Sequence, residues 1–77
     1  LSAAFQLLDN GGKLFLIEQA SALADVTTAL RAHRLEPKRM QFLYTKPNTP
    51  ARRVLIEAKK LGRPGLVVEP PDWLQES

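Results

Sequence analysis

The chain has 77 residues, of which 44% are hydrophobic and 25% are charged, a composition typical of one small globular domain and not of a disordered segment. It contains no cysteine, which excludes a disulfide framework and a thiolate metal site and is compatible with a reducing cytoplasm. The net charge is +3. No signal-peptide pattern and no apolar run of ~18 residues is present, so we expect no membrane partner, and a cytoplasmic location is the expectation that fits the lack of cysteine.

The first predicted element is a helix over residues 1–10. Its alanine and leucine residues favour helical backbone, and the Gly11-Gly12 pair ends it because glycine accepts the left-handed conformation of a helix C-terminus. The chain opens on Leu1 with this helix already under way. We therefore expect a fragment of a longer polypeptide.

A strand over residues 13–18 and a helix over residues 21–34 follow. The strand has four consecutive large apolar residues, Leu14 to Ile17, and this pattern predicts burial on both faces, as in a parallel strand covered by helices. Ser21 is the expected N-cap of the helix, because its hydroxyl can accept a hydrogen bond from the first turn. The apolar residues of the helix recur at helical spacing and predict one buried stripe.

Pro37 is expected to end the helical segment, because the residue before a proline avoids helical backbone. A strand over residues 39–45 then alternates apolar and polar side chains, and a strand over residues 52–60 is apolar on both sides at its centre. The loop between the two strands contains two prolines and predicts a turn region. The tail adds a brief extended "LVV" segment, after which a double proline is expected to end ladder pairing.

These elements predict an α/β fold in the order helix, strand, helix, strand, strand. The first two strands are joined by a helical crossover, so we expect them to be parallel with a right-handed connection. The last two are joined by a short loop, so we expect an antiparallel pair. Because the third strand is apolar on both sides, it is expected to lie between the other two, which gives the spatial order 1-3-2.

The positive charge is concentrated in residues 38–63, which hold eight Lys and Arg residues against the single acid Glu57. Basic side chains at a strand-turn-strand corner can neutralise phosphates and make binding salt-dependent. The alternative is a solvated rim that keeps the sheet edges soluble. The candidate nucleic-acid-binding residues are Lys46, Arg52, Arg53, Lys59, Lys60 and Arg63.

The remaining residues with reactive or binding chemistry form no complete site. His33 has no serine, cysteine or carboxylate arrangement nearby, which indicates a surface residue at a helix end and not a general base. No His, Asp or Glu cluster has the spacing of metal ligands. Trp73 is expected to cover apolar surface, with a base-stacking platform as the alternative. We therefore predict no catalytic, cofactor-binding or metal-binding residue in this chain.

Several segments nevertheless resemble a known family. "GGKLFLIEQ", "LRAHRLEPKRM", "ARRVLIEAKKLGRPGL" and the double proline resemble the C-terminal half of class I S-adenosylmethionine-dependent methyltransferases. The resemblance is closest to the bacterial enzymes that methylate adenine N6 in the anticodon loop of valine tRNA, and it covers nearly the whole chain. It implies a partial Rossmann-like methyltransferase sheet with an antiparallel final hairpin, and residues 1–77 as one C-terminal subdomain.

The resemblance also implies which functions lie elsewhere. The family's glycine-rich cofactor turn, the acidic residue after its second strand and its Asn-Pro-Pro-Tyr/Phe motif have no counterpart here, since Pro70-Pro71 is flanked by Glu69 and Asp72. No family catalytic residue is therefore carried over to this chain. S-adenosylmethionine and tRNA or another RNA are expected to bind the parent protein, and the isolated fragment is expected to bind no cofactor and to be inactive.

Two other functions stay open at this point: a small non-enzymatic α/β module that binds RNA or protein, and a methyltransferase with a different acceptor. If the chain holds only part of a larger sheet, one further expectation follows. In an intact sheet the strand over residues 13–18 would pair on its far side with another parallel strand, so the exposed edge of the isolated chain is expected to cause self-association or partial unfolding.

Overall fold

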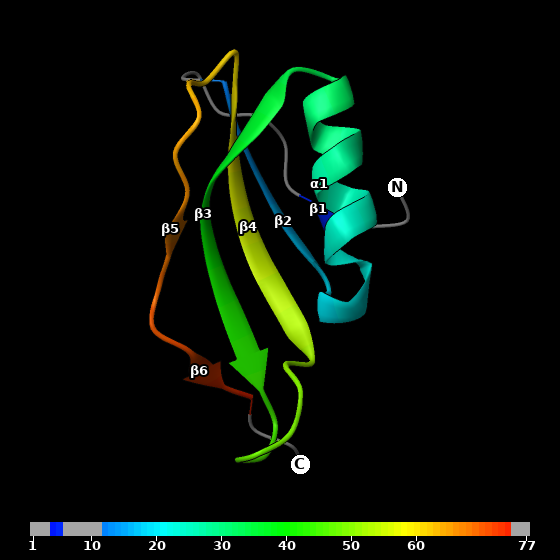
Figure 1. Cartoon of the computed structure of the whole chain (residues 1–77), viewed down its shortest axis with the longest axis vertical. Helices are drawn as coiled ribbons and strands as arrows, with labels where there is room; N and C mark the ends of the chain where they lie inside the picture. The colour runs from blue at the N-terminus through cyan, green and yellow to red at the C-terminus, as the bar shows by residue number, and fades with distance from the viewer. Residues whose placement is uncertain (1–3, 6–11, 75–77) are drawn as a thin grey trace.

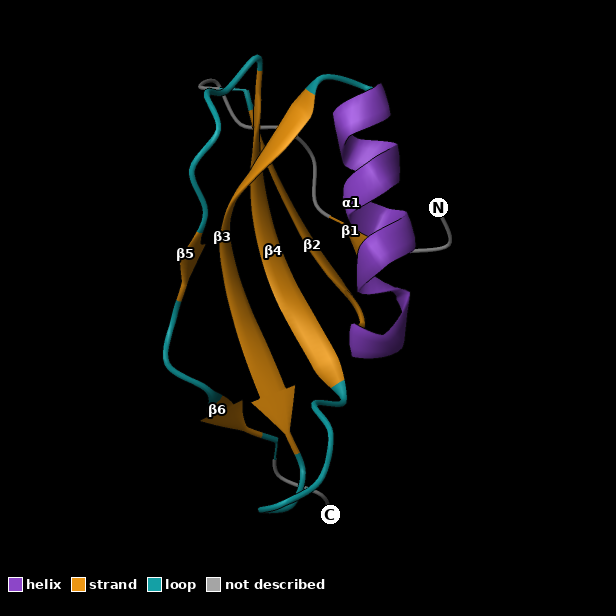
Figure 2. Ribbon diagram, in the orientation of Figure 1, coloured by secondary structure: helices purple, strands orange, loops and turns teal. Residues whose placement is uncertain are grey.

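The structure is a computed structural model that describes residues 4–5 and 12–74. In these residues, six strands form one sheet, and a helical segment lies against one face of it (Figures 1 and 2). The main strands are β2 (Lys13–Gln19), β3 (Leu35–Tyr44) and β4 (Arg53–Lys60). The helical segment consists of the 3-10 turn η1 (Ala20–Ala22) and the helix α1 (Leu23–Ala32). The two-residue strands are β1 (Ala4–Phe5), β5 (Val67–Val68) and β6 (Asp72–Trp73).

The strand order defines the architecture. It is β1-β2-β4-β3-β5, with β6 also paired to β3. β4 is antiparallel to both β2 and β3, so these two strands are parallel to each other and are joined through η1 and α1. The predicted 1-3-2 order of the main strands and the antiparallel final pair are both confirmed. The chain is therefore a small mixed α/β domain.

The hydrophobic core lies between α1 and one face of the sheet. Side chains alternate between the two faces of a strand, so every second residue of the main strands points toward the helix. Val26 and Leu30 of the predicted helical stripe are buried there. They form one cluster with buried residues of the three main strands, namely Leu16, Met40, Val54, Ile56 and Ala58.

The prediction that the strand after Gly12 is buried on both faces was wrong. Phe15 is 40% exposed and Ile17 is 37% exposed, because α1 covers only one face of the sheet. Leu55 of the central strand β4 is 39% exposed for the same reason. We call the face opposite α1 the open face.

The helix predicted over residues 1–10 is not present at the two of its residues that the structure describes. Ala4–Phe5 form β1 and pair antiparallel with Ile17 and Leu16 of β2. A strand at this position satisfies backbone groups along the outer edge of β2, which local helix propensity does not take into account. Residues 1–3 and 6–10 lie outside the described residues.

The helical segment differs from the predicted range of 21–34 at both ends. Ser21 lies inside η1 and caps neither η1 nor α1, whose N-cap residues make no side-chain hydrogen bond. The N–H of Ala20 donates instead to the carbonyl of Arg52 at 3.0 Å, so the chain entering β4 supplies the partner that a cap would otherwise provide. In the described part of the chain, no helix is long and apolar enough to cross a membrane.

β3 begins at Leu35 and not at residue 39, because the chain reverses at Arg34, which adopts a left-handed φ of 61°. The strand then runs through Pro37, which was expected to end a helix. Pro37 is buried and lies beside a bulge before Arg39. A strand tolerates proline at such a position, because the residue there need not donate an N–H to the ladder.

The tail returns to the sheet twice. β5 confirms the brief extended "LVV" segment and pairs parallel with β3. The prediction that Pro70-Pro71 ends ladder pairing was wrong, since β6 pairs with the end of β3 directly after them. Between the two contacts, Nε2 of Gln41 donates to the carbonyl of Pro70 at 3.1 Å, so a side chain of β3 joins the tail to the sheet where the prolines have no N–H to donate.

Candidate functional site

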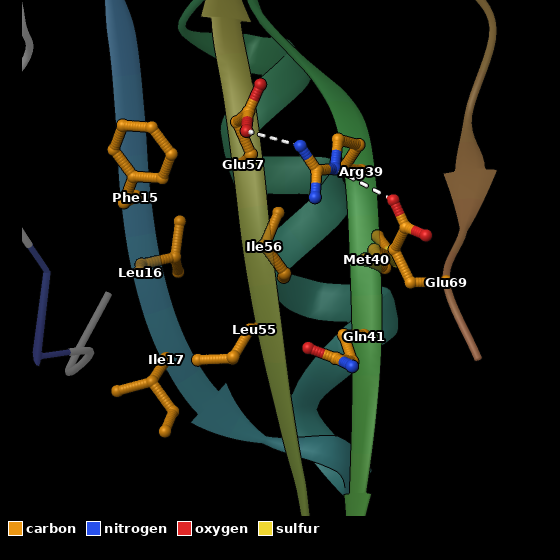
Figure 3. Close-up of a pocket in the computed structure, with 10 residues that line it drawn as sticks. All are labelled: Phe15, Leu16, Ile17, Arg39, Met40, Gln41, Leu55, Ile56, Glu57 and Glu69. Carbon is orange, nitrogen blue, oxygen red and sulfur yellow. Dashed lines mark ion pairs between the residues drawn. The ribbon is translucent and has the colours of Figure 1, made fainter. Parts of the chain in front are cut away.

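The open face carries an apolar patch. Phe15 and Ile17 on β2 lie beside Leu55 on β4, which pairs with Ile17 in the ladder. Figure 3 views these side chains with α1 behind the sheet. They line an open depression of about 360 Å³ together with polar residues of the neighbouring strands. Grouped apolar side chains of this kind are typical of a surface that another molecule or another part of a larger protein covers.

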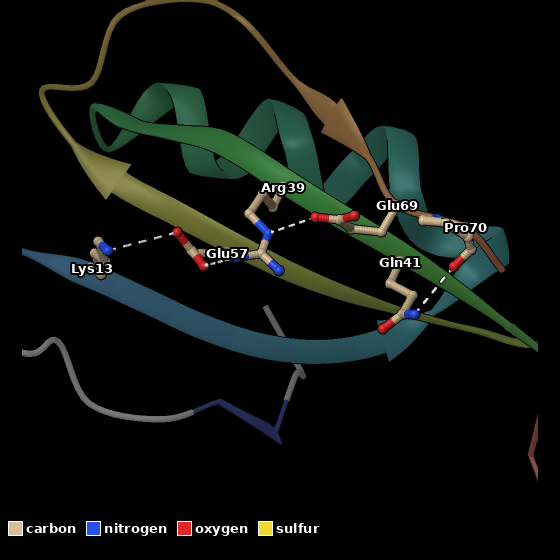
Figure 4. A network of polar contacts seen from close by, with 6 residues as sticks. All are labelled: Lys13, Arg39, Gln41, Glu57, Glu69 and Pro70. Carbon is tan, nitrogen blue, oxygen red and sulfur yellow. Dashed lines mark hydrogen bonds and ion pairs between the residues drawn. The ribbon is translucent and has the colours of Figure 1, made fainter. Parts of the chain in front are cut away.

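A row of charged side chains crosses one end of the same face (Figure 4). Glu57 lies 4.0 Å from Lys13 and 3.7 Å from Arg39, and the Nε of Arg39 lies 3.1 Å from Glu69. The row thus links β2, β4, β3 and the residue after β5. Because all four side chains are at least partly exposed, each ion pair is expected to contribute at most about 1 kcal/mol. Arg39 is paired with two acids and is therefore not a free cation.

The structure divides the six predicted phosphate-binding candidates between the two ends of the main strands. We call these two ends of the sheet the carboxyl edge and the amino edge, after the termini of β2 and β3. The parallel strands β2 and β3 both end at one edge, where the carboxyl-edge group lies: Lys46, Arg52 and Arg53. At the other end of β4 lies the amino-edge group: Lys59, Lys60 and Arg63. β4 has eight residues, and at about 3.3 Å per residue its two ends are about 23 Å apart. The six residues therefore do not form one surface.

The carboxyl-edge group lies beside a polar depression of about 290 Å³, which is lined by Gln19, Ser21, Ala51, Arg52 and Arg53. Main-chain hydrogen bonds hold this edge together. The N–H of Arg52 donates to the carbonyl of Leu43 at 2.8 Å, and the carbonyl of Arg52 accepts the bond from Ala20. The main chain of Arg52 thus joins β3 to η1. Neither arginine side chain takes part in an ion pair or hydrogen bond with the described residues.

An aromatic pair at the same edge was missed by the sequence analysis. Tyr44, the last residue of β3, pairs in register with Trp73 of β6. Their ring centroids are 5.8 Å apart with planes inclined at 47°, and Trp73 is 53% exposed. The only sequence signal was the aromatic residue itself, because no local pattern indicates that the tail returns to β3 after two prolines.

The other titratable residues do not assemble into a reactive site in the described part of the chain. His33 is the exposed C-cap residue of α1. The 2.8 Å hydrogen bond from Arg31 to Glu36, together with the attraction between their charges, raises the pKa of Arg31, so this guanidinium stays charged. Among the described residues, no three His, Asp or Glu side chains are placed to hold a metal ion.

The comparisons with known proteins do not assign a family. No protein-family model matches the chain, and no curated protein matches it.

Self-association through the outer edge of β2 stays a prediction. In the described residues, β1 covers that edge only at Leu16 and Ile17, and the apolar patch lies beside it. We expect a concentration-dependent dimer in sedimentation equilibrium. Ile17→Lys would bring two ammonium groups together at such an interface and is expected to raise the dissociation constant at least about tenfold. Leu61→Lys, at a residue that is 70% exposed in the opposite turn, is the matched control. A strictly monomeric, cooperatively folded 77-residue chain without substitutions would contradict the prediction.

Proposed function

We propose that this chain is the C-terminal part of a class I S-adenosylmethionine-dependent methyltransferase that acts on RNA, with adenine N6 of tRNA as the target. In this proposal the chain completes a Rossmann-like sheet in a cytoplasmic protein. The glycine-rich cofactor turn and the Asn-Pro-Pro motif belong to another part of that protein, because neither occurs in these 77 residues. That other part binds S-adenosylmethionine and positions the adenine.

The position of β4 is the observation that carries the proposal. β4 lies antiparallel between two parallel strands that α1 connects. A simple strand-helix-strand unit would instead place β3 directly beside β2. The family resemblance implies the inserted arrangement for the end of a methyltransferase sheet, so the strand order supports it. The order supports the fold of the parent and not its acceptor, because one fold serves many reactions.

The resembling segments coincide with the elements that build this arrangement. "GGKLFLIEQ" contains β2, "LRAHRLEPKRM" runs from α1 into β3, and "ARRVLIEAKKLGRPGL" contains β4 and the following turn. The open face fits the same proposal. α1 covers only one face of the sheet, and the other face carries a group of exposed apolar side chains. The apolar patch of Phe15, Ile17 and Leu55 is where the rest of such a protein would pack.

Methyl transfer by the native gene product tests the proposal. The protein would be expressed from its own start codon and incubated with methyl-labelled S-adenosylmethionine and unmodified tRNA transcripts. We expect labelled N6-methyladenosine after digestion of the tRNA to nucleosides. The 77-residue chain, assayed alone as the matched control, is expected to transfer no methyl group.

Each other outcome has a defined meaning. Label in a different nucleoside or in protein would replace the proposed acceptor and keep the methyltransferase. A native gene product that binds neither S-adenosylmethionine nor a methyl acceptor would overturn the proposal and favour a non-enzymatic binding module.

A further inference from the structure

The carboxyl edge of the sheet brings together two kinds of side chain that single-stranded nucleic acids contact. The parallel strands β2 and β3 both end at this edge, and β4 begins between them. The positively charged carboxyl-edge group lies there, and so does the exposed indole of Trp73. The opposite edge has the amino-edge group but no aromatic side chain among its described residues.

The ladder fixes how close the two kinds of side chain are. Arg53 on β4 pairs with Leu43 on β3, and the next residue of β3, Tyr44, pairs with Trp73. Neighbouring strands lie about 4.8 Å apart, so the backbones of Arg53 and Trp73 are separated by two strand spacings, about 10 Å. A few linked nucleotides span such a distance.

We propose that this edge binds single-stranded RNA, with Arg52 and Arg53 contacting phosphates and Trp73 stacking on an unpaired base. The inference rests on the proposed function for the choice of RNA as the nucleic acid. Arginine forms strong bidentate hydrogen bonds to phosphate, and base stacking on an aromatic ring tolerates any sequence. A partner that was merely acidic would use the arginines and leave the indole without a role.

A salt titration separates the two basic groups. The chain would be titrated with a labelled single-stranded oligoribonucleotide, and binding followed by fluorescence anisotropy at increasing NaCl. Each phosphate contact to a single strand contributes about 0.7 to the slope of log K against log salt. R52A/R53A is therefore expected to flatten the slope by about 1.4. K59A/K60A removes the same charge from the other end of β4 and is expected to leave the slope unchanged.

The variants are designed to keep the fold. The hydrogen bonds of Arg52 to Leu43 and Ala20 are made by its main chain, so they survive the change of side chain. Far-UV circular dichroism checks this point. R52K/R53K is expected to restore most of the slope, and it keeps the test decisive if the alanine variant does not fold.

Trp73 is the only tryptophan of the chain, so its fluorescence reports on the indole directly. We expect the oligoribonucleotide to quench it, and W73A to weaken binding about fivefold or more, which corresponds to one lost stacking contact. Polyglutamate is the probe for a merely acidic partner, and it is expected to compete weakly and to cause no quenching.

The inference would be overturned by no binding of the oligoribonucleotide, by equal flattening by both double variants, or by equal quenching by polyglutamate. These results are distinct from a failure of the proposed function. If the full protein carrying R52A/R53A still transfers methyl groups and binds tRNA with unchanged affinity, the RNA-binding inference is wrong and the proposed function stands. If the oligoribonucleotide binds as expected but the full protein transfers no methyl group, the proposed methyltransferase function is wrong and the RNA-binding edge stands.

Discussion

Ile56→Lys is expected to unfold the domain, whereas Leu55→Lys, one residue earlier, is expected to leave it folded. Ile56 is 2% exposed and packs in the core beneath α1, while Leu55 is 39% exposed on the open face. A lysine at residue 56 would place an ammonium group among apolar side chains without a partner, at a cost of several kcal/mol. At ~0.05–0.15 kcal/mol per residue, a domain of this size has a total stability of only about 4–12 kcal/mol.

Urea unfolding followed by far-UV circular dichroism measures both variants. We expect the free energy of unfolding of Leu55→Lys to change by less than about 1 kcal/mol, because the ammonium stays in water. Ile56→Lys is expected to lack a cooperative transition. Unfolding of both variants would mean that the open face is buried in solution, and a folded Ile56→Lys variant would mean that β4 presents its other face to the helix.

The strand order was predictable because it depends on composition along single strands. Val54, Leu55 and Ile56 make β4 apolar on both sides, and this pattern placed it correctly at the centre. The same pattern gave a wrong prediction of burial for β2. An apolar run in the middle of a sheet indicates that the strand has strand neighbours, but it does not show whether both faces are covered. Phe15 and Ile17 are exposed because α1 packs on the opposite face of the sheet.

The errors in the prediction are at positions where distant partners decide the local structure. Ser21 has the right side chain for an N-cap but makes no capping bond. The N–H of Ala20, at the start of the helical segment, donates to the carbonyl of Arg52 instead. Pro37 disfavours helix and was taken as a boundary, but a bulge in the β3–β4 ladder admits it into a strand. Neither partner is visible in a window of ten or fifteen residues.

The candidate site was predictable in its residues and not in its grouping. Charge counting identified all six basic candidates from a single segment. Their separation follows from β4 being a continuous strand of eight residues, which carries Arg53 and Lys60 to opposite edges. The contribution of Trp73 depends on β6 pairing with β3, a contact between residues far apart in the chain. The carboxyl edge is therefore a product of topology.

Leu30→Ala is expected to lower the free energy of unfolding by about 2–5 kcal/mol, because truncation removes apolar contacts and leaves a cavity. Leu30 is 1% exposed and is among the largest fully buried side chains of the described chain. It is also the residue through which the last turn of α1 contacts the sheet cluster. Its loss is therefore expected to loosen the only helix that covers the core in the described part of the chain.

Leu61→Ala is the matched control, since the same atoms are removed from a side chain that is 70% exposed, and we expect a change below about 0.5 kcal/mol. Urea titration of both variants gives the two values. The slope of free energy against urea is expected to stay the same, because it depends on the surface exposed on unfolding. Equal stability of the two variants would mean that α1 does not pack on β2, β3 and β4 in solution.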